Sequence, residues 1–248
     1  MYTVIVSEKD RAGMNIFQNL QESDNFELIK IKEDSLYADD VETKGDIIIF
    51  ATRHSSEQQK PCLCVHTPGN WSTAELGGQD SKLCISPATL QTESYLKLKE
   101  NNTLDFEVTN EATHHGPLMD KPCMFIEIGS TQLQWENRQA GQIIAKTIMN
   151  LANKKLIKKK PIFGIGGPHY CNNFNKLIER SDYALGHVCP KYMLDKLTPE
   201  LIRQAMDKTY EESPEVVLDW KGLGKYKQHV IEMIEELGLN YKKIKELM

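Results

Sequence analysis

Short apolar runs recur along the chain and predict nine β-strands. Most of these runs are rich in isoleucine, valine and phenylalanine, and turn residues separate them. The predicted strands cover residues 2–7, 26–31, 46–51, 62–66, 104–109, 123–128, 162–165, 183–188 and 216–218. Apolar residues at helical spacing predict helices between several strands, most clearly over residues 138–152. The other predicted helices cover residues 12–20, 170–178, 199–210 and 226–237.

Strands that alternate with helices predict the fold class. We expect an α/β protein with three α/β/α layers around a mixed, mostly parallel sheet. The 248 residues contain no Gly/Ser linker and no internal repeat, so we predict a single domain over residues 1–248. Residues 52–103 hold few apolar runs and many turn residues, such as Pro68-Gly69-Asn70, and are expected to form an irregular insertion.

Composition narrows the class of protein. The apolar runs are far shorter than the roughly 18 residues that a membrane helix needs, which indicates a protein without a membrane partner. The first residues enter a strand pattern without a basic leader, so we predict a cytoplasmic protein. We also expect a monomer. The six cysteines form no CxxC pairs, which favours reduced thiols.

The charge pattern bears on a nucleic-acid partner. A net charge of −5 argues against a DNA-binding protein. Lysines nevertheless cluster within residues 154–160 and again within residues 242–245. Such clusters fit either solvated helix ends or contacts to phosphate groups.

The histidines point to the chemistry of the protein. Six of the seven lie at, or just after, the downstream end of a predicted strand, and only His229 lies within a predicted helix. The carboxyl ends of neighbouring strands in an open α/β sheet meet in one crevice, so we expect these side chains to converge. The six are His54, His66, His114, His115, His169 and His187. Converging imidazoles predict a metal centre or an acid–base site.

A carboxylate and a bent loop extend this prediction. Glu127 lies inside an apolar predicted strand, where a charged group needs a partner. Neutral imidazoles with one or two carboxylates form the usual zinc shell. His114 and His115 are adjacent and would point in opposite directions on a regular strand. Both can enter one site only if the segment that leads into Gly116-Pro117 is a bent loop.

The segment 164–192 holds further candidates. Its glycine-rich turn has the outline of a dinucleotide fingerprint, but His169 replaces the third glycine and Pro168 removes an amide donor. We therefore exclude nucleotide binding by this turn. Gly166 and Gly167 fit either donors to a developing oxyanion or an ordinary tight turn. Lys191 fits either a contact to a phosphate or carboxylate or a surface lysine.

Six short motifs occur in order along the chain. They are Thr52-Arg53-His54-Ser55, Val65-His66-x-x-Gly69-Asn70, Glu111-x-Thr113-His114-His115-Gly116-Pro117, Phe125-x-Glu127-Ile128-Gly129-Ser130, Gly166-Gly167-x-His169-Tyr170 and Gly186-His187-x-x-x-Lys191-Tyr192. In this combination and order, the chain resembles the archaeal and plant-type D-aminoacyl-tRNA deacylases.

The resemblance implies an enzyme with a phosphorylase/hydrolase-like fold. It implies cleavage of the ester that joins a D-amino acid to the 3′ end of tRNA, so the expected partner is the acceptor end of D-aminoacyl-tRNA. Zinc is the expected cofactor, as one or two ions. We assign catalysis to His115, His169, Glu127, Gly166 and Gly167, metal binding to His54, His66, His114 and His187, and substrate binding to Arg53, Asn70, Lys191 and Tyr192.

Two other functions fit the same residues. A zinc amidase or carboxypeptidase-like hydrolase would use the same ligands and would hydrolyse small peptides. A tRNA-binding protein without turnover would use the lysine clusters and the strand-end glycines. In that case, replacing His115 or His169 by alanine would change stability only.

Overall fold

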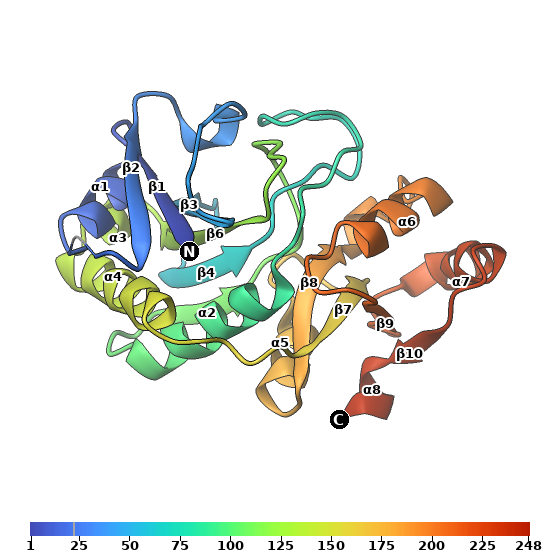
Figure 1. Cartoon of the computed structure of the whole chain (residues 1–248). Coiled ribbons are helices and arrows are strands. Elements are labelled where there is room, and N and C mark those ends of the chain that lie inside the picture. Colours follow the sequence, from blue (N-terminus) through green and yellow to red (C-terminus); the bar gives the residue numbers. More distant parts are fainter. Residues whose placement is uncertain (22) are drawn as a thin grey trace.

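The structure, a computed structural model of the chain, describes residues 1–21 and 23–248 and contains two β-sheets, seen at the left and right of Figure 1. The first sheet has six strands in the order β2-β1-β3-β6-β4-β5. Their bounds are β1 Tyr2–Ser7, β2 Phe26–Ile31, β3 Ile47–Ser55, β4 Cys62–His66, β5 Glu107–Asn110 and β6 Cys123–Ser130. All neighbours are parallel except β4 and β6, so β4 and β5 run against the rest of the sheet.

The second sheet has four parallel strands in the order β10-β9-β7-β8. They are β7 Lys160–Ile165, β8 Tyr183–Cys189, β9 Glu215–Leu218 and β10 Tyr241–Lys243. One face packs against α5 (Asn172–Glu179) and α8 (Ile244–Leu247), and the other packs against α6 (Pro199–Asp207) and α7 (Lys227–Glu236). The alternation of Ile162 and Phe163 explains both layers, because successive side chains on a strand point to opposite faces.

Among the described residues, α-helices cover only one face of the first sheet. That face packs against α1 (Arg11–Phe17) and α4 (Arg138–Ala152), with the short α3 (Gln132–Trp135) between β6 and α4. Loops and the 3₁₀ helix η1 (Ser35–Tyr37) cover the other face, where Phe50 and Phe125 stack with ring centroids 4.9 Å apart. A sheet face covered by loops leaves room for polar groups and cavities, and the candidate site lies there.

The segment 52–103 is more regular than expected. It includes β4 and a helix of fourteen residues, α2 (Ala88–Asn101). The helix packs against both β4 of the first sheet and β8 of the second. Its buried side chains include Gln91, Thr92 and Ser94, so α2 lacks the one-sided apolar pattern that predicts a helix. The irregular parts of the segment are mainly the short loop between β3 and β4 and the longer stretch between β4 and α2.

The mixed α/β class with mostly parallel strands is confirmed. All nine predicted strands are present, but they are divided between two sheets because β7 begins a second parallel sheet after α4. The three-residue strand β10 was not predicted. In the described part of the chain, no helix is both long and apolar enough to cross a bilayer.

Candidate active site

Strand pairing aligns polar side chains into three rows on the loop-covered face of the first sheet. Residues paired across β3, β6 and β4 point to the same side of the sheet. The rows are Phe50, Phe125 and His66; then Thr52, Glu127 and Cys64; then His54, Gly129 and Cys62. Glu127 is therefore the central group of a patch rather than a group at the edge of the sheet.

Glu127 is buried and surrounded by polar neighbours. One carboxylate oxygen accepts a hydrogen bond of 2.8 Å from the Thr52 hydroxyl. The other lies 3.6 Å from His66 Nε2 and 3.9 Å from His54 Nδ1. Gly129 leaves the space for His54, because a Cβ atom at Gly129 would lie 2.5 Å from the imidazole carbon Cδ2. The strand thus presents a carboxylate between two histidines.

The segment after β5 joins the two sheets and carries the next ligand candidates. The Glu111 amide donates to the Val65 carbonyl of β4 at 3.0 Å. The Ala112 amide donates to the His169 carbonyl at 2.7 Å, and the Thr113 amide donates to the Val188 carbonyl of β8 at 3.0 Å. His114 and His115 follow directly, so they lie at the junction of the sheets.

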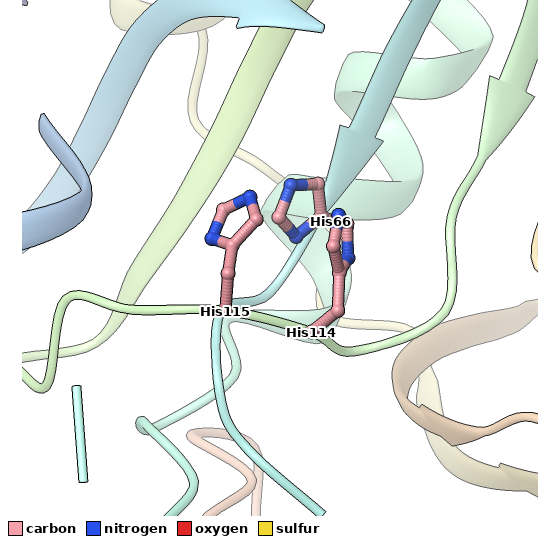
Figure 2. A group of neighbouring side chains, drawn as sticks. All are labelled: His66, His114 and His115. Atoms are coloured by element: carbon pink, nitrogen blue, oxygen red, sulfur yellow. The ribbon is translucent and has the colours of Figure 1, made fainter. Parts of the chain in front are cut away.

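Three imidazoles meet at this junction, as Figure 2 shows. The ring centroids of His66 and His114 are 4.2 Å apart, and those of His114 and His115 are also 4.2 Å apart. His115 has a φ angle of +46°, which turns the backbone so that adjacent side chains both face His66. The bent loop predicted before Gly116-Pro117 is therefore present.

His114 and His115 are prepared to act as lone-pair donors. The Nδ1–H groups of His114 and His115 donate to the carbonyls of Ala112 and Gly116, at 2.8 and 2.6 Å, which leaves each Nε2 free. Burial, together with the neighbouring imidazoles, holds the pKa of His114 well below its usual range and lowers that of His115 to about 3. Both rings are neutral at physiological pH, which is the form that binds a metal ion.

The donor set fits a metal ion such as zinc. One ligand atom from each of His66, His114 and His115 lies within 4.8 Å of the others. Among the described residues, four buried side-chain N or O atoms have no hydrogen-bond partner, and three of them are both ring nitrogens of His66 and one oxygen of Glu111. Buried polar atoms are normally paired, so these orphaned atoms indicate that a bound group belongs here.

Glu111 links two further histidines. One of its oxygens lies 3.2 Å from His54 Nδ1 and 3.1 Å from His169 Nε2. Burial opposes the charge of Glu111, but these two hydrogen bonds outweigh it and hold its pKa well below the usual range. Burial likewise opposes protonation of His54, but Glu111 and then Glu127 raise its pKa to about 9. Glu111 and His54 therefore form an ion pair at neutral pH.

His169 connects the buried cluster to the surface. Its Nε2 donates to ionised Glu111, so Nδ1 carries the lone pair, and this nitrogen accepts a hydrogen bond of 2.9 Å from the Tyr192 hydroxyl. A carboxylate that orients an imidazole with one free nitrogen is the arrangement of a general base. Tyr170 contacts His54 in the reverse sense, because His54 is a cation and its Nε2–H donates to the Tyr170 hydroxyl at 3.2 Å.

Two cavities open onto the cluster. The first has a volume of about 270 Å³ and is lined by residues that include Asp34, Leu36, Leu76, Phe125 and His169. The second, of about 190 Å³, shares Leu76, His114 and His115 with it and extends to Asn70 and Tyr192. A substrate group of the size of an amino acid therefore has access to the histidines.

The structure does not bring every predicted residue into the cluster. His187 is fully buried, with Nδ1 3.2 Å from the Thr113 hydroxyl and Nε2 donating to the Cys84 carbonyl at 3.0 Å. Both ring nitrogens are thus occupied, and burial lowers the pKa of His187 to about 4, so it supports the fold rather than binding metal. The Gly166 amide donates to the Cys189 carbonyl at 2.8 Å and is not free for an oxyanion.

The predicted substrate-binding residues have different surroundings. Arg53 lines the first cavity, but its guanidinium already pairs with Asp10 and Asp34 at 3.3 and 2.9 Å. The Asn70 amide donates to the carbonyl of Gly77 at 3.0 Å and therefore braces a loop. Lys191 and Tyr192 belong to η2 (Lys191–Met193). Gly167 lies beside these two residues, and its carbonyl accepts the Lys191 amide.

Sequence reasoning missed three residues of the cluster, namely Glu111, Tyr170 and Cys64. The Cys64 thiol donates to Glu127 at 3.7 Å and lies with Glu111 in a second group of possible ligands. Glu111 stands next to a predicted strand within the same motif as His114, and a carboxylate at that position was a signal that could have identified it. Cys64 gave no signal, because a cysteine in an apolar strand is normally a core residue.

The fold and the site together define a class of protein. An α/β scaffold that holds neutral imidazoles, an ionised carboxylate and an oriented histidine at the base of a cavity has the parts of a hydrolytic active site. Comparisons with known proteins agree. A family model described as D-aminoacyl-tRNA deacylase matches residues 41–242.

Individual relatives match over nearly their whole length. The D-aminoacyl-tRNA deacylases of Thermococcus kodakarensis and Pyrococcus furiosus are 36% and 35% identical to this chain, and each alignment covers 97% of this chain and 99% of the relative. A crystal structure of a conserved protein of unknown function has a TM-score of 0.92 and 30% identity, and the match covers 100% of this chain and 96% of that one. The chain belongs to the D-aminoacyl-tRNA deacylase family, as its six motifs predicted.

Proposed function

We propose that this protein hydrolyses the ester between a D-amino acid and the 3′ end of tRNA and so recycles the tRNA. The observation that carries the proposal is the convergence of His66, His114 and His115 with Glu111 and His169 in a member of this family. An aminoacyl ester is already activated, so a positioned water, a base and stabilisation of the oxyanion are enough for catalysis.

We assign a zinc ion to the imidazoles of His66, His114 and His115. Glu127 lies beside His66 and would contribute negative charge. Zinc bound there supplies Lewis acidity, which polarises a carbonyl and makes water nucleophilic near neutral pH. A second group of His54, Cys64, Glu111 and Glu127 could hold a second ion only with His54 deprotonated, because a protonated imidazole has no lone pair for a metal.

His169 serves as the general base. Glu111 fixes the orientation of its ring, so that Nδ1 is the nitrogen able to take a proton from the attacking water. Tyr192 occupies this nitrogen in the structure and would yield it to substrate. The protonated His169 then returns the proton to the leaving 3′ oxygen of the tRNA. His54, held as a cation by Glu111, stabilises negative charge that develops nearby.

The cavity of about 270 Å³ takes the amino-acid half of the substrate. Leu36, Leu76 and Phe125 line an apolar region for its side chain, and Asp34 can accept a hydrogen bond from its ammonium group. We further propose that the enzyme works as a cytoplasmic monomer on the acceptor end of tRNA.

The test is deacylation of D-tyrosyl-tRNA and L-tyrosyl-tRNA by the purified protein. We expect release of D-tyrosine, loss of activity after chelation, and recovery when zinc is added back. Metal analysis should find zinc in the untreated protein, and replacing the exposed His229 by alanine should leave the rate unchanged. Release from neither tRNA in the presence of zinc would contradict the proposal, whereas faster hydrolysis of small peptides would favour an amidase.

A further inference from the structure

A third cavity adjoins the site at the carboxyl end of the second sheet. It has a volume of about 730 Å³ and is bounded by the turn after β7, by η2 and by the segment after β9. We call it the tyrosine groove, after Tyr192 and Tyr226 in its lining. Because the Tyr192 hydroxyl also bonds His169, the groove begins where the histidine cluster ends.

The segment 220–227 gives this groove its chemical character. It reads Trp220-Lys221-Gly222-Leu223-Gly224-Lys225-Tyr226-Lys227 and holds three lysines, two aromatic residues and no acidic residue, in a chain with a net charge of −5. Lys221 and Tyr226 of this segment line the groove, and Lys225 stands beside the lining, with its ammonium 5.0 Å from the centroid of the Tyr226 ring. Lysines interleaved with aromatic rings along a groove are the features with which proteins hold single-stranded nucleic acid.

The opposite wall adds a further positive charge. Lys191 extends toward the segment 220–227, because a Cβ atom at Gly224 would lie 3.2 Å from its Cε. The acidic residues of the lining, Asp219 and Asp195, are both engaged. Asp219 is buried and accepts from the Asn173 amide at 2.8 Å, whereas Asp195 pairs with Lys196 at 3.3 Å. Lys191 and Lys221 therefore supply the positive charge of the lining that a phosphate would meet.

The lysine cluster within residues 154–160 lies elsewhere. Lys154 and Lys158 to Lys160 line a separate cavity beside the start of β7, while His169 follows the end of that strand. This cluster and the tyrosine groove are thus at opposite ends of β7, and of these two it is the groove that adjoins the catalytic histidine.

We propose that the tyrosine groove holds the 3′-terminal nucleotides of the tRNA, with Lys221 and Lys225 at phosphates and Tyr226 stacked on a base. The proposal rests on the proposed function, because it assigns the nucleotide half of the same substrate. The amino acid lies in the cavity around Phe125, and the ester lies between the two regions, beside His169. The glycine turn is not the binding element, since Pro168 has no amide and the Gly166 amide is occupied.

Binding of RNA tests the groove independently of catalysis. The probe is a short single-stranded RNA that ends in CCA and carries a 5′ fluorophore, and its affinity is measured by fluorescence anisotropy at several salt concentrations. In Lys221→Ala/Lys225→Ala we expect about ten-fold weaker binding at low salt, and a slope of log K against log salt that is smaller by about 1.4, or 0.7 for each lost phosphate contact.

The matched control is Lys154→Ala/Lys155→Ala, which removes the same charge from the distant lysine cluster and should retain the wild-type affinity and slope. Tyr226→Ala should weaken binding by at least about five-fold, and Tyr226→Phe should restore it because a phenyl ring still stacks. Thermal melting of each variant verifies that it is folded.

Two results would overturn the groove. One is equal loss of affinity in both double-lysine variants, and the other is an unchanged slope in Lys221→Ala/Lys225→Ala while the wild type deacylates D-tyrosyl-tRNA. By contrast, RNA binding that follows the expected pattern in a protein without deacylase activity would support the groove and contradict the proposed hydrolysis.

Discussion

Histidines in the site have different charge states because their neighbours differ, although they lie only a few ångströms apart. His114 and His115 are buried beside other imidazoles and stay neutral, whereas His54 faces Glu111 and Glu127 and is a cation at neutral pH. Neutral rings can bind a metal ion, and a cation can stabilise developing negative charge. The surroundings therefore give one type of side chain two chemical roles.

His66 illustrates the conflict between function and stability at one residue. Both of its ring nitrogens are buried without hydrogen bonds, and its ring stacks on Phe125 with centroids 5.1 Å apart. An unpaired buried polar group costs about 1–3 kcal/mol. We predict that His66→Leu stabilises the metal-free protein by about 1 kcal/mol or more, measured by urea unfolding in the presence of chelator.

The same variant should lose bound zinc and at least about 100-fold in deacylation rate, since even outer-shell changes at metal sites cost about 10–100-fold. His229→Leu, at an exposed position, is the control and should change none of these quantities. A His66→Leu protein that retains zinc would remove His66 from the ligand set.

Glu111 should set the pH dependence of stability through His54. A pKa raised from 6.5 to about 9 means that this contribution to the free energy of unfolding is fully present below pH 6.5 and is lost as pH rises through about 9. The lowered pKa values of His114 and His115 act at more acidic pH and leave this window free. We predict that Glu111→Gln flattens the decline between pH 6.5 and 9, measured by urea unfolding in chelator.

A decline of equal size in wild type and Glu111→Gln would show that another group causes it.

At the scale of residues, sequence reasoning identified the histidines of the site better than their contacts. Histidines near strand ends are visible in the sequence, but their partners depend on the pairing of β3, β6 and β4. His187 also lies near a strand end, but the structure shows that its ring nitrogens are occupied by the Thr113 hydroxyl and the Cys84 carbonyl.

At the scale of elements, the apolar pattern predicted helices that pack on one side and missed a helix that packs on several sides. The prediction for α4 was correct at both ends, Arg138 and Ala152, because one face of this helix is apolar and the other is solvated. Helix α2 lies between the two sheets and buries polar residues that bond their surroundings. The Thr92 hydroxyl, for example, accepts the Leu185 amide of β8 at 2.8 Å. The sequence of α2 therefore has no clear helical periodicity of apolar residues.

The start of α2 depends on a distant carboxylate. Pro87 provides no side-chain cap, and buried Glu211 instead accepts the amides of Ala88 and Thr89 at 3.0 and 2.7 Å. Loss of a helix cap costs about 0.5–2 kcal/mol. We predict that Glu211→Ala lowers the free energy of unfolding by about 1–2 kcal/mol, measured by urea denaturation.

The neighbouring exposed residue gives the matched control for this cap. Glu212→Ala should stay within about 0.5 kcal/mol of wild type, as is usual for surface substitutions. Equal effects of the two substitutions would mean that general charge, rather than the two hydrogen bonds, supports α2.

At the scale of the whole molecule, one hydrophobic core passes through both sheets. Ile49 and Ile126 of the first sheet belong to the same buried cluster as Ile162 and Val217 of the second. The segment 111–113 hydrogen-bonds to both sheets and carries the site between them. The apolar pattern of the sequence does not predict the division into two sheets, because each strand would be equally apolar in one sheet or in two.

This shared core predicts a single cooperative unfolding transition and therefore supports one domain over residues 1–248. Trp135 packs near the first sheet and Trp220 near the second, so each can report on its own side of the molecule. With the other two tryptophans replaced by phenylalanine, each single-tryptophan variant should show the same urea midpoint by fluorescence and by circular dichroism. Comparison of the two signals within one variant removes the stability effect of the substitutions. If Trp220 fluorescence changed at lower urea than the circular dichroism signal, the second sheet would unfold separately, and the site at the junction would lose its histidine base before the first sheet melted.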